Sequence, residues 1–154
     1  MLFRFVKAYY KALISYAADN GSYPVGTGSW CLGEGYSCTA GTQNTTANNL
    51  IRKYLNNADP LPTPSLNGAQ YGASKRYGAA YAYMSAATLD GSPYYWGISY
   101  ILEGPVSCGL DRIAGNPPGQ YWPNFSSTQN ASGATERQTN NTWCRMILPD
   151  PATI

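Results

Sequence analysis

LFRFVKAYYKALISYAADNGSYP, at residues 2–24, carries the strongest structural signal in this chain. Its apolar and aromatic residues recur at steps of three and four, the spacing that places side chains on one side of a helix. The main apolar row consists of Leu2, Val6, Tyr9, Leu13 and Tyr16. A second apolar row consists of Phe3, Tyr10, Ile14 and Ala17, and a separate polar row consists of Arg4, Lys7 and Lys11. The pattern predicts one long helix from Met1 to about Asp19.

The residues that follow end this helix and lead into loops. Asn20-Gly21 is a typical helix C-terminus, because both residues adopt the left-handed conformation readily, and Pro24 cannot continue a helix. Residues 22–46 are rich in glycine, serine and threonine and predict an ordered loop. Apolar residues at helical spacing within 46–57 predict a second, short helix, which is followed by a proline-rich connector.

The C-terminal half of the chain predicts a β-sheet. The strand signals are residues 77–84, 94–102 and 142–148. The first two of these runs flank Asp90-Gly91, a dipeptide that favours the turn of a β-hairpin. Side chains alternate along the second run, so one face of the sheet should pack on the helix. We predict a single, loop-rich α+β domain over residues 1–154, in which one long N-terminal helix packs on a small antiparallel sheet within residues 77–148.

The composition is that of an exported protein. Charged residues make up only 12% of the chain, against a usual share of about 25%, and hydroxyls and amides form the polar surface instead. The formal charge is +2, and the basic residues are dispersed apart from the pairs Arg52-Lys53 and Lys75-Arg76. Nucleic-acid-binding domains carry a basic stripe or patch, so no nucleic-acid partner is expected.

The four cysteines are Cys31, Cys38, Cys108 and Cys144. An even number of cysteines in a weakly charged, exported chain predicts two disulfides formed in an oxidising compartment. Of the three connectivities we favour Cys31–Cys38, which closes a short glycine-rich loop, and Cys108–Cys144, which staples a long C-terminal excursion. A zinc site is disfavoured because the chain has no histidine and no Cys-x-x-Cys pair.

Residues typical of a catalytic site are scarce. Without histidine the chain cannot build a Ser-His-Asp or Cys-His system, and its carboxylates stand apart in turns and loops. We expect no enzymatic activity, no catalytic residue and no cofactor. Asp111 and Asp150, together with loop carbonyls, are candidate oxygen ligands for calcium. Their spacing matches no calcium-binding motif, so no metal site is predicted.

Residues 8–12, AYYKA, and 16–24, YAADNGSYP, resemble the end of the first helix in type IV pilins and type II secretion pseudopilins. In such a phrase Asn-Gly terminates the helix and Tyr-Pro turns the chain onto a globular head. Cys108 and Cys144 resemble the pair that brackets the C-terminal region of pilins. The family's leader-peptidase site, hydrophobic first half of the helix and N-terminal glutamate have no counterpart here, and a Cys31–Cys38 pair is not a general family feature.

The resemblance implies a structural subunit of a type IV pilus or a pseudopilus, at the cell surface or in the periplasm. The partners would be other pilin subunits in a homo-oligomeric filament. Residues 1–19 would be the C-terminal half of the spine helix, and a membrane would be contacted only through a missing hydrophobic segment before it. The head, rich in Tyr, Ser, Thr and Asn, would serve subunit contacts or surface adhesion. The helix residues expected to pack in the filament are Leu2, Phe3, Val6, Tyr9, Tyr10, Leu13 and Ile14.

The aromatic content supports an alternative interpretation. The chain has four tryptophans and 14 tyrosines, and exposed aromatic rings offer large amphipathic contact surfaces. The chain could therefore be a secreted module that binds carbohydrate or another surface ligand. Tyr121 and Trp122, on the proline-rich loop, are the candidate stacking residues, and their exposure as a cluster would favour this function over the filament.

Overall fold

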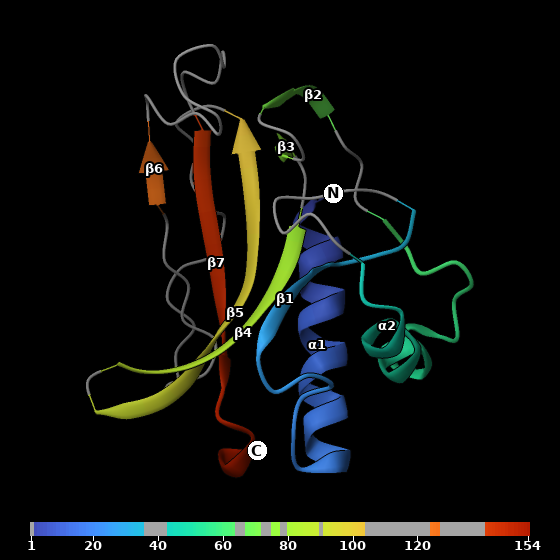
Figure 1. Cartoon of the computed structure of the whole chain (residues 1–154), viewed down its shortest axis with the longest axis vertical. Helices are drawn as coiled ribbons and strands as arrows, with labels where there is room; N and C mark the ends of the chain where they lie inside the picture. The colour runs from blue at the N-terminus through green and yellow to red at the C-terminus, as the bar shows by residue number, and fades with distance from the viewer. Residues whose placement is uncertain are drawn as a thin grey trace.

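The computed structural model describes residues 2–35, 43–63, 67–71, 75–77, 80–89, 91–103, 124–126 and 141–154. The chain belongs to the α+β class, as predicted (Figure 1). Its helical elements are α1 (Leu2–Asn20), α2 (Thr45–Ile51) and the 3-10 helices η1 (Arg52–Leu55) and η2 (Pro151–Thr153). Its strands are β1 (Gly28–Cys31), β2 (Asn67–Tyr71), β3 (Lys75–Tyr77), β4 (Ala80–Leu89), β5 (Ser92–Glu103), β6 (Asn124–Ser126) and β7 (Asn141–Pro149).

Five strands form one antiparallel sheet in the order β1-β4-β5-β7-β6, and β2 pairs separately with β3. The long strands β4 and β5 form the hairpin predicted around Gly91. Figure 1 shows α1 running alongside this sheet, with α2 on the other side of the helix. The sheet therefore presents one face to α1 and a second face that points away from it.

The hydrophobic core lies between α1 and the sheet. Val6, Tyr9 and Leu13 of α1 are fully buried and belong to the same cluster as Ala82 and Ile98 of the sheet. Burying an apolar side chain of this size contributes about 1.5–3 kcal/mol. This is larger than any difference in helix propensity, so packing against the sheet holds α1 in place.

The structure corrects the expected extent of the sheet. The loop predicted over residues 22–46 contains β1, which pairs with β4 at the edge of the sheet. The sheet is therefore not confined to residues 77–148. β1 begins at Gly28 and has only four residues. A strand this short shows no alternating pattern that can be recognised in the sequence. β1 is fixed by Trp30, whose side chain is buried in the core.

The second helix changes its geometry partway. The predicted helix over residues 46–57 corresponds to α2 followed directly by η1. Asn44 caps α2, because its side-chain oxygen accepts a hydrogen bond from the Ala47 amide at 2.9 Å. Asn56 ends η1 in the left-handed conformation, with φ of 57°, which asparagine tolerates better than most residues.

The sheet order restricts the disulfide connectivity. Cys31 is disulfide-bonded, whereas Cys38 and Cys108 lie outside the described residues. The backbone of Cys144 belongs to β7, and both β4 and β5 lie between β7 and β1. Three strand spacings separate Cys31 from Cys144 by about 14 Å, while a disulfide needs Cα atoms within about 7 Å. A Cys31–Cys144 bond is therefore excluded, which leaves Cys38 or Cys108 as the partner of Cys31.

Glu34 ties the loop after β1 to η1 and to the proline-rich connector. One carboxylate oxygen accepts a hydrogen bond from the Arg52 guanidinium, and the other accepts one from the Leu61 amide at 2.7 Å. Arg52 also donates to the carbonyl of Ala58. The hydrogen bond from Arg52, followed by that from Leu61, lowers the pKa of Glu34 below its ordinary value of 4.5.

Replacing Glu34 by glutamine is expected to flatten the acid dependence of thermal unfolding. A lowered pKa in the folded state means that Glu34 contributes stability above its unfolded value of about 4.5, and that this contribution is lost as the pH falls through the folded value. The difference in Tm between the wild type and Glu34→Gln should therefore be largest near neutral pH and shrink in acid. A difference that stays constant down to strongly acidic pH would contradict this.

Asp59→Asn is the matched control for this measurement. Asp59 lies 3.7 Å from the same guanidinium, but its side chain is 87% exposed. Solvent reduces the energy of such an exposed ion pair to near zero. The Tm of Asp59→Asn should therefore depend on pH in the same way as that of the wild type.

Candidate functional site

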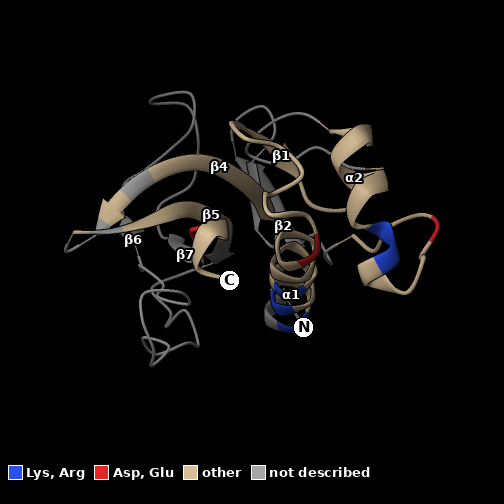
Figure 2. Cartoon of the chain, turned by 90° about the horizontal axis from the view of Figure 1, so that it is seen from below, with Lys and Arg blue, Asp and Glu red and all other residues tan. Residues whose placement is uncertain are grey.

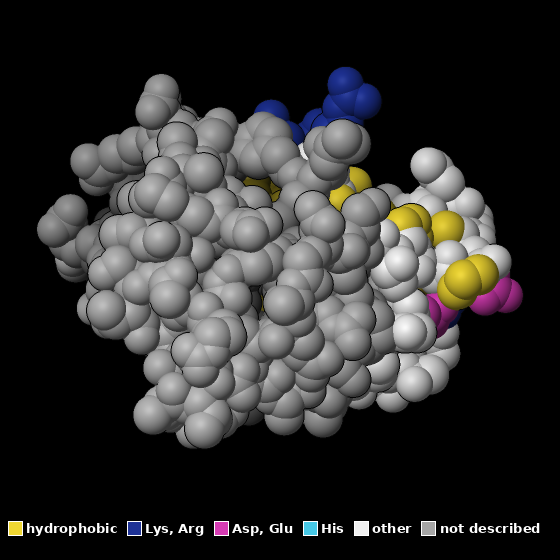
Figure 3. All heavy atoms as spheres, turned by 90° about the horizontal axis from the view of Figure 1, so that it is seen from above, with side chains coloured by type: hydrophobic (Ala, Val, Ile, Leu, Met, Phe, Trp, Pro, Cys, Tyr) yellow, Lys and Arg dark blue, Asp and Glu magenta, His cyan; other side chains and the backbone are white. Residues whose placement is uncertain are grey.

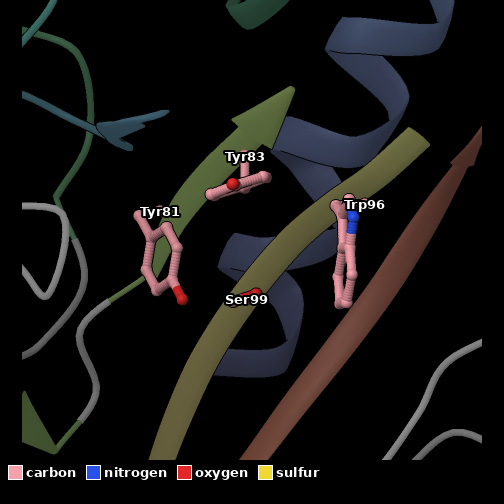
Figure 4. Close-up of a pocket in the computed structure, with 4 residues that line it drawn as sticks. All are labelled: Tyr81, Tyr83, Trp96 and Ser99. Atoms are coloured by element: carbon pink, nitrogen blue, oxygen red, sulfur yellow. The ribbon is translucent and has the colours of Figure 1, made fainter. Parts of the chain in front are cut away.

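An aromatic cluster lies on the face of the sheet that points away from α1. Successive side chains alternate along a strand, so Tyr81 and Tyr83 of β4 project opposite to Ala82, the core residue between them. Antiparallel pairing places Ser99 opposite Tyr81 and Gly97 opposite Tyr83. Figure 4 shows that Trp96 joins these residues on the same face, with α1 behind the sheet.

Two β-bulges bring Trp96 to this face. Met84 and Ser85 of β4 together lie opposite the single residue Trp96. Trp96 and Gly97 of β5 together lie opposite the single residue Ile147 of β7. In an unbroken strand Trp96 would share the core face with the other even-numbered residues of β5, and the bulges turn it to the opposite face.

Gly97 is the residue that makes this double bulge feasible. Its φ of 87° lies in the left-handed region, which residues with a side chain rarely adopt. A Cβ at this position would come within 2.0 Å of the Met146 carbonyl oxygen and 2.9 Å of the Ile147 Cα. The backbone of β7 thus approaches β5 more closely than any residue except glycine allows.

The four side chains line a cavity of about 280 Å³ (Figure 4). The rings of Tyr83 and Trp96 meet edge to face, with centroids 6.1 Å apart and an interplanar angle of 69°, an arrangement favoured by the ring quadrupoles. Ser99, which is buried, lies between them and Tyr81. Tyr83 is 42% exposed, so this large aromatic ring is offered to solvent instead of to the core.

The chemistry of this cavity is that of binding. The four described lining residues offer aromatic ring faces and hydroxyl groups, which stack, donate and accept hydrogen bonds. The arrangement suits a ligand that has both a flat apolar side and hydroxyl groups.

The exposed side of α1 forms a second distinct surface. Arg4, Lys7 and Lys11 are exposed on this side, and residues 2–18 contain no acidic residue. In Figure 2 the stretches of the α1 ribbon coloured blue for Lys and Arg lie on the side of the helix away from β4 and α2. In Figure 3 basic side chains gather at the upper edge, apart from the acidic ones at the right. We call Arg4, Lys7 and Lys11 the basic stripe.

The structure places several of the predicted filament-packing residues in the core of the domain. Val6, Tyr9 and Leu13 have no exposed surface, so they cannot contact another subunit while the domain is folded as described. This differs from the sequence-based expectation, because the domain's own sheet and connector cover that row of the helix. The side chains of Leu2 and Phe3 lie outside the described part of the chain.

Tyr10 and Ile14 occupy an intermediate position. Both are half-buried against the core, and burial raises the pKa of Tyr10 to about 12, so its phenol stays neutral. Tyr16, from the main apolar row, packs edge to face on Tyr54 of η1 with centroids 6.1 Å apart. Tyr10 and Ile14 are therefore the predicted packing residues that retain surface next to the basic stripe.

The remaining predicted site residues contribute little to either surface. Tyr121, Trp122 and Asp111 lie outside the described residues. Asp150 caps η2, since its side chain accepts a hydrogen bond from the Ala152 amide at 2.9 Å. Within the described ranges no group of three potential metal-ligating residues is close enough to hold a metal ion. No helix among these residues is long and apolar enough to cross a bilayer.

The sequence did not predict the aromatic cavity. Trp96 was visible as one of four tryptophans, and the two tyrosines of β4 as part of an aromatic run. The usable signal was the period-two alternation of Tyr81 and Tyr83 next to a hairpin turn. It was insufficient because the bulges change which residues of β5 face the same way.

Comparisons of the chain with protein-family models, with curated proteins and with solved structures found no match.

Proposed function

We propose that the chain is a structural subunit of a type IV pilus or a pseudopilus-like filament, at the cell surface or in the periplasm. Its partners in this proposal are further copies of itself. The similarity of residues 8–24 to the end of the pilin spine helix supports the proposal, as does a helix, α1, packed beside an antiparallel sheet.

The observation that carries the proposal is the mixed surface of α1. The basic stripe lies next to Tyr10 and Ile14, which are half-buried. Both residues pack partly against the core and keep the rest of their surface beside the charges of the stripe. Protein interfaces, by contrast, are enriched in aromatic residues and arginine and have a polar rim. This side of α1 is therefore the surface we assign to subunit contacts.

The charge of the basic stripe determines what kind of contact it can make. Arg4 and Lys11 of one copy would repel those of a second copy placed against the same side of the helix, since residues 2–18 contain no acidic residue. We therefore assign the stripe to a contact with a different surface of the next subunit. Such a heterologous contact produces a ring when it closes and an open helical filament when it does not. A basic stripe is thus compatible with filament growth and disfavours a symmetric dimer.

Three further features belong to this proposal. The two predicted disulfides, Cys31–Cys38 and Cys108–Cys144, would staple the head in an oxidising compartment. A hydrophobic segment preceding α1 would provide the membrane contact before assembly. The head would serve contacts between neighbouring subunits or adhesion to surfaces.

The proposal is tested on the natural gene product in its own cells. Filaments sheared from the cell surface, or isolated from the periplasm, are expected to contain the chain as their repeating subunit. The reading frame before Met1 is expected to encode about twenty apolar residues, the length of a membrane-spanning helix. Recovery of the chain only as a free protein, exported behind an ordinary cleavable signal, would overturn the proposal.

Charge reversal on the stripe gives a test at residue level. Lys11→Glu is expected to reduce the yield of filaments several-fold while the Tm of the isolated domain stays at the wild-type value, because Lys11 is exposed. Lys53→Glu makes the same charge change at an exposed position on η1 and should leave the filament yield unchanged. Equal yields for the wild type and both variants would show that the stripe is no subunit contact.

A further inference from the structure

We propose that the cavity lined by Tyr81, Tyr83, Trp96 and Ser99 binds one pyranose ring of a glycan. The inference is independent of the filament proposal, because the cavity lies on the sheet face away from α1 (Figure 4). It would give the chain a saccharide-binding site whether or not the chain assembles.

The geometry of the two neighbouring rings supports a stacking site. Tyr83 and Trp96 are inclined by 69°, so a ligand that lies flat on one ring meets the other as a wall. The electron-rich face of an aromatic ring attracts weakly positive C–H groups, and one side of a pyranose ring presents several of them. A corner of two aromatic rings thus fixes both the position and the orientation of a sugar.

The hydroxyl groups in the cavity match the polar edge of a sugar. Tyr81, Tyr83 and Ser99 each carry a hydroxyl, which both donates and accepts hydrogen bonds. Sugar hydroxyls have the same dual capacity, so each can be satisfied in either direction. Ser99 lies on the strand at the base of the cavity, opposite Tyr81.

The size of the cavity narrows the ligand class. The cavity of about 280 Å³ lies at the small end of the usual range for ligand sites, about 300–1,000 Å³. A single sugar ring fits this volume better than a nucleotide or a long peptide.

The shape of the cavity is fixed by the backbone and not by loops alone. Trp96 reaches this face only because of the double bulge at Gly97, a conformation that needs glycine. Bulges recur where a strand must re-aim a side chain toward a binding site. A ring pair held by two strands is preorganised, which reduces the entropy lost when a ligand binds.

The test is a titration of the intact protein with methyl glycosides of neutral hexoses and of N-acetylhexosamines, followed by tryptophan fluorescence and by saturation-transfer NMR. Saturable binding of at least one glycoside is expected. Tyr83→Ala and Trp96→Ala should each weaken it by at least about tenfold, because each removes one side of the stacking corner. Tyr83→Phe, which keeps the ring, should weaken it less than Tyr83→Ala.

Tyr54→Ala is the matched control variant. Tyr54 forms an edge-to-face pair with Tyr16 at the same centroid distance, 6.1 Å, but on the α1–η1 side of the molecule. Binding should be unaffected in this variant, and circular dichroism should show that all variants are folded. The proposal is overturned if no glycoside binds saturably in the millimolar range, or if the folded Tyr83→Ala and Trp96→Ala variants bind like the wild type.

Discussion

Replacing Gly97 by alanine is expected to lower the free energy of unfolding by about 3–5 kcal/mol, enough to unfold a marginal domain. The new Cβ would lie 2.0 Å from the Met146 carbonyl oxygen and 2.9 Å from the Ile147 Cα. Both obstacles are backbone atoms of β7, which cannot move aside without breaking the pairing of β5 with β7. The left-handed φ of 87° adds conformational strain.

Gly91→Ala separates the two causes of this loss. Gly91 also has a left-handed φ, 79°, but a Cβ there would have no atom within 4 Å. Its replacement should cost only the strain of the conformation, about 1–2 kcal/mol. Urea denaturation of the two variants and the wild type measures both values. Equal losses of stability in the two variants would contradict the close approach of the β7 backbone to Gly97.

Gly97 also shows where the sequence was informative and where it was not. The hairpin was predictable, because Asp90-Gly91 separates two aromatic-rich runs. Gly97 reads in the sequence as one small residue in an alternating strand. Its requirement for a left-handed conformation depends on how β7 lies beside β5, and β7 is more than forty residues away in the chain. A pairing between such distant residues leaves no local pattern.

The aromatic cavity was unpredictable for the same reason. Continuing the register of the hairpin from Leu89 opposite Ser92 would place Tyr83 opposite Ile98, a core residue. The bulge shifts the register by one, so that Tyr83 faces Gly97 and Tyr81 faces Ser99. A one-residue shift exchanges the two faces of a strand. Because the sequence does not reveal the bulge, it could not show which residues form the cavity together.

The helix illustrates a different limit of sequence analysis. The spacing of apolar residues predicted α1 and its two apolar rows, and local periodicity is sufficient for that. It did not reveal which row the domain would cover. The contact of Tyr16 with Tyr54 shows that η1 covers part of the helix, and the core takes Val6, Tyr9 and Leu13. The surface available to partners is what remains, namely the basic stripe with Tyr10 and Ile14 beside it.

Tyr9→Ala is the second substitution with a large expected effect, and it distinguishes a core residue from a filament contact. Tyr9 has no exposed surface. The centroid of its ring lies 4.7 Å from that of the Phe5 ring, and its hydroxyl donates a hydrogen bond to the Pro62 carbonyl at 2.7 Å. Removing a buried aromatic side chain leaves a cavity and costs about 3–5 kcal/mol. Chemical denaturation of the isolated domain should show this loss in the absence of any assembly.

Two further variants show how the loss at Tyr9 arises. Tyr9→Phe keeps the ring and removes only the hydrogen bond, so it should cost about 1–2 kcal/mol, because the Pro62 carbonyl loses its donor. Lys11 lies two positions after Tyr9, on the exposed side of the same helix. Lys11→Ala should therefore leave the stability of the domain unchanged. If Tyr9 instead served subunit contacts, Tyr9→Ala would impair filament formation and leave the isolated domain as stable as the wild type. That result would require α1 to lie differently on the sheet, with its main apolar row turned outward.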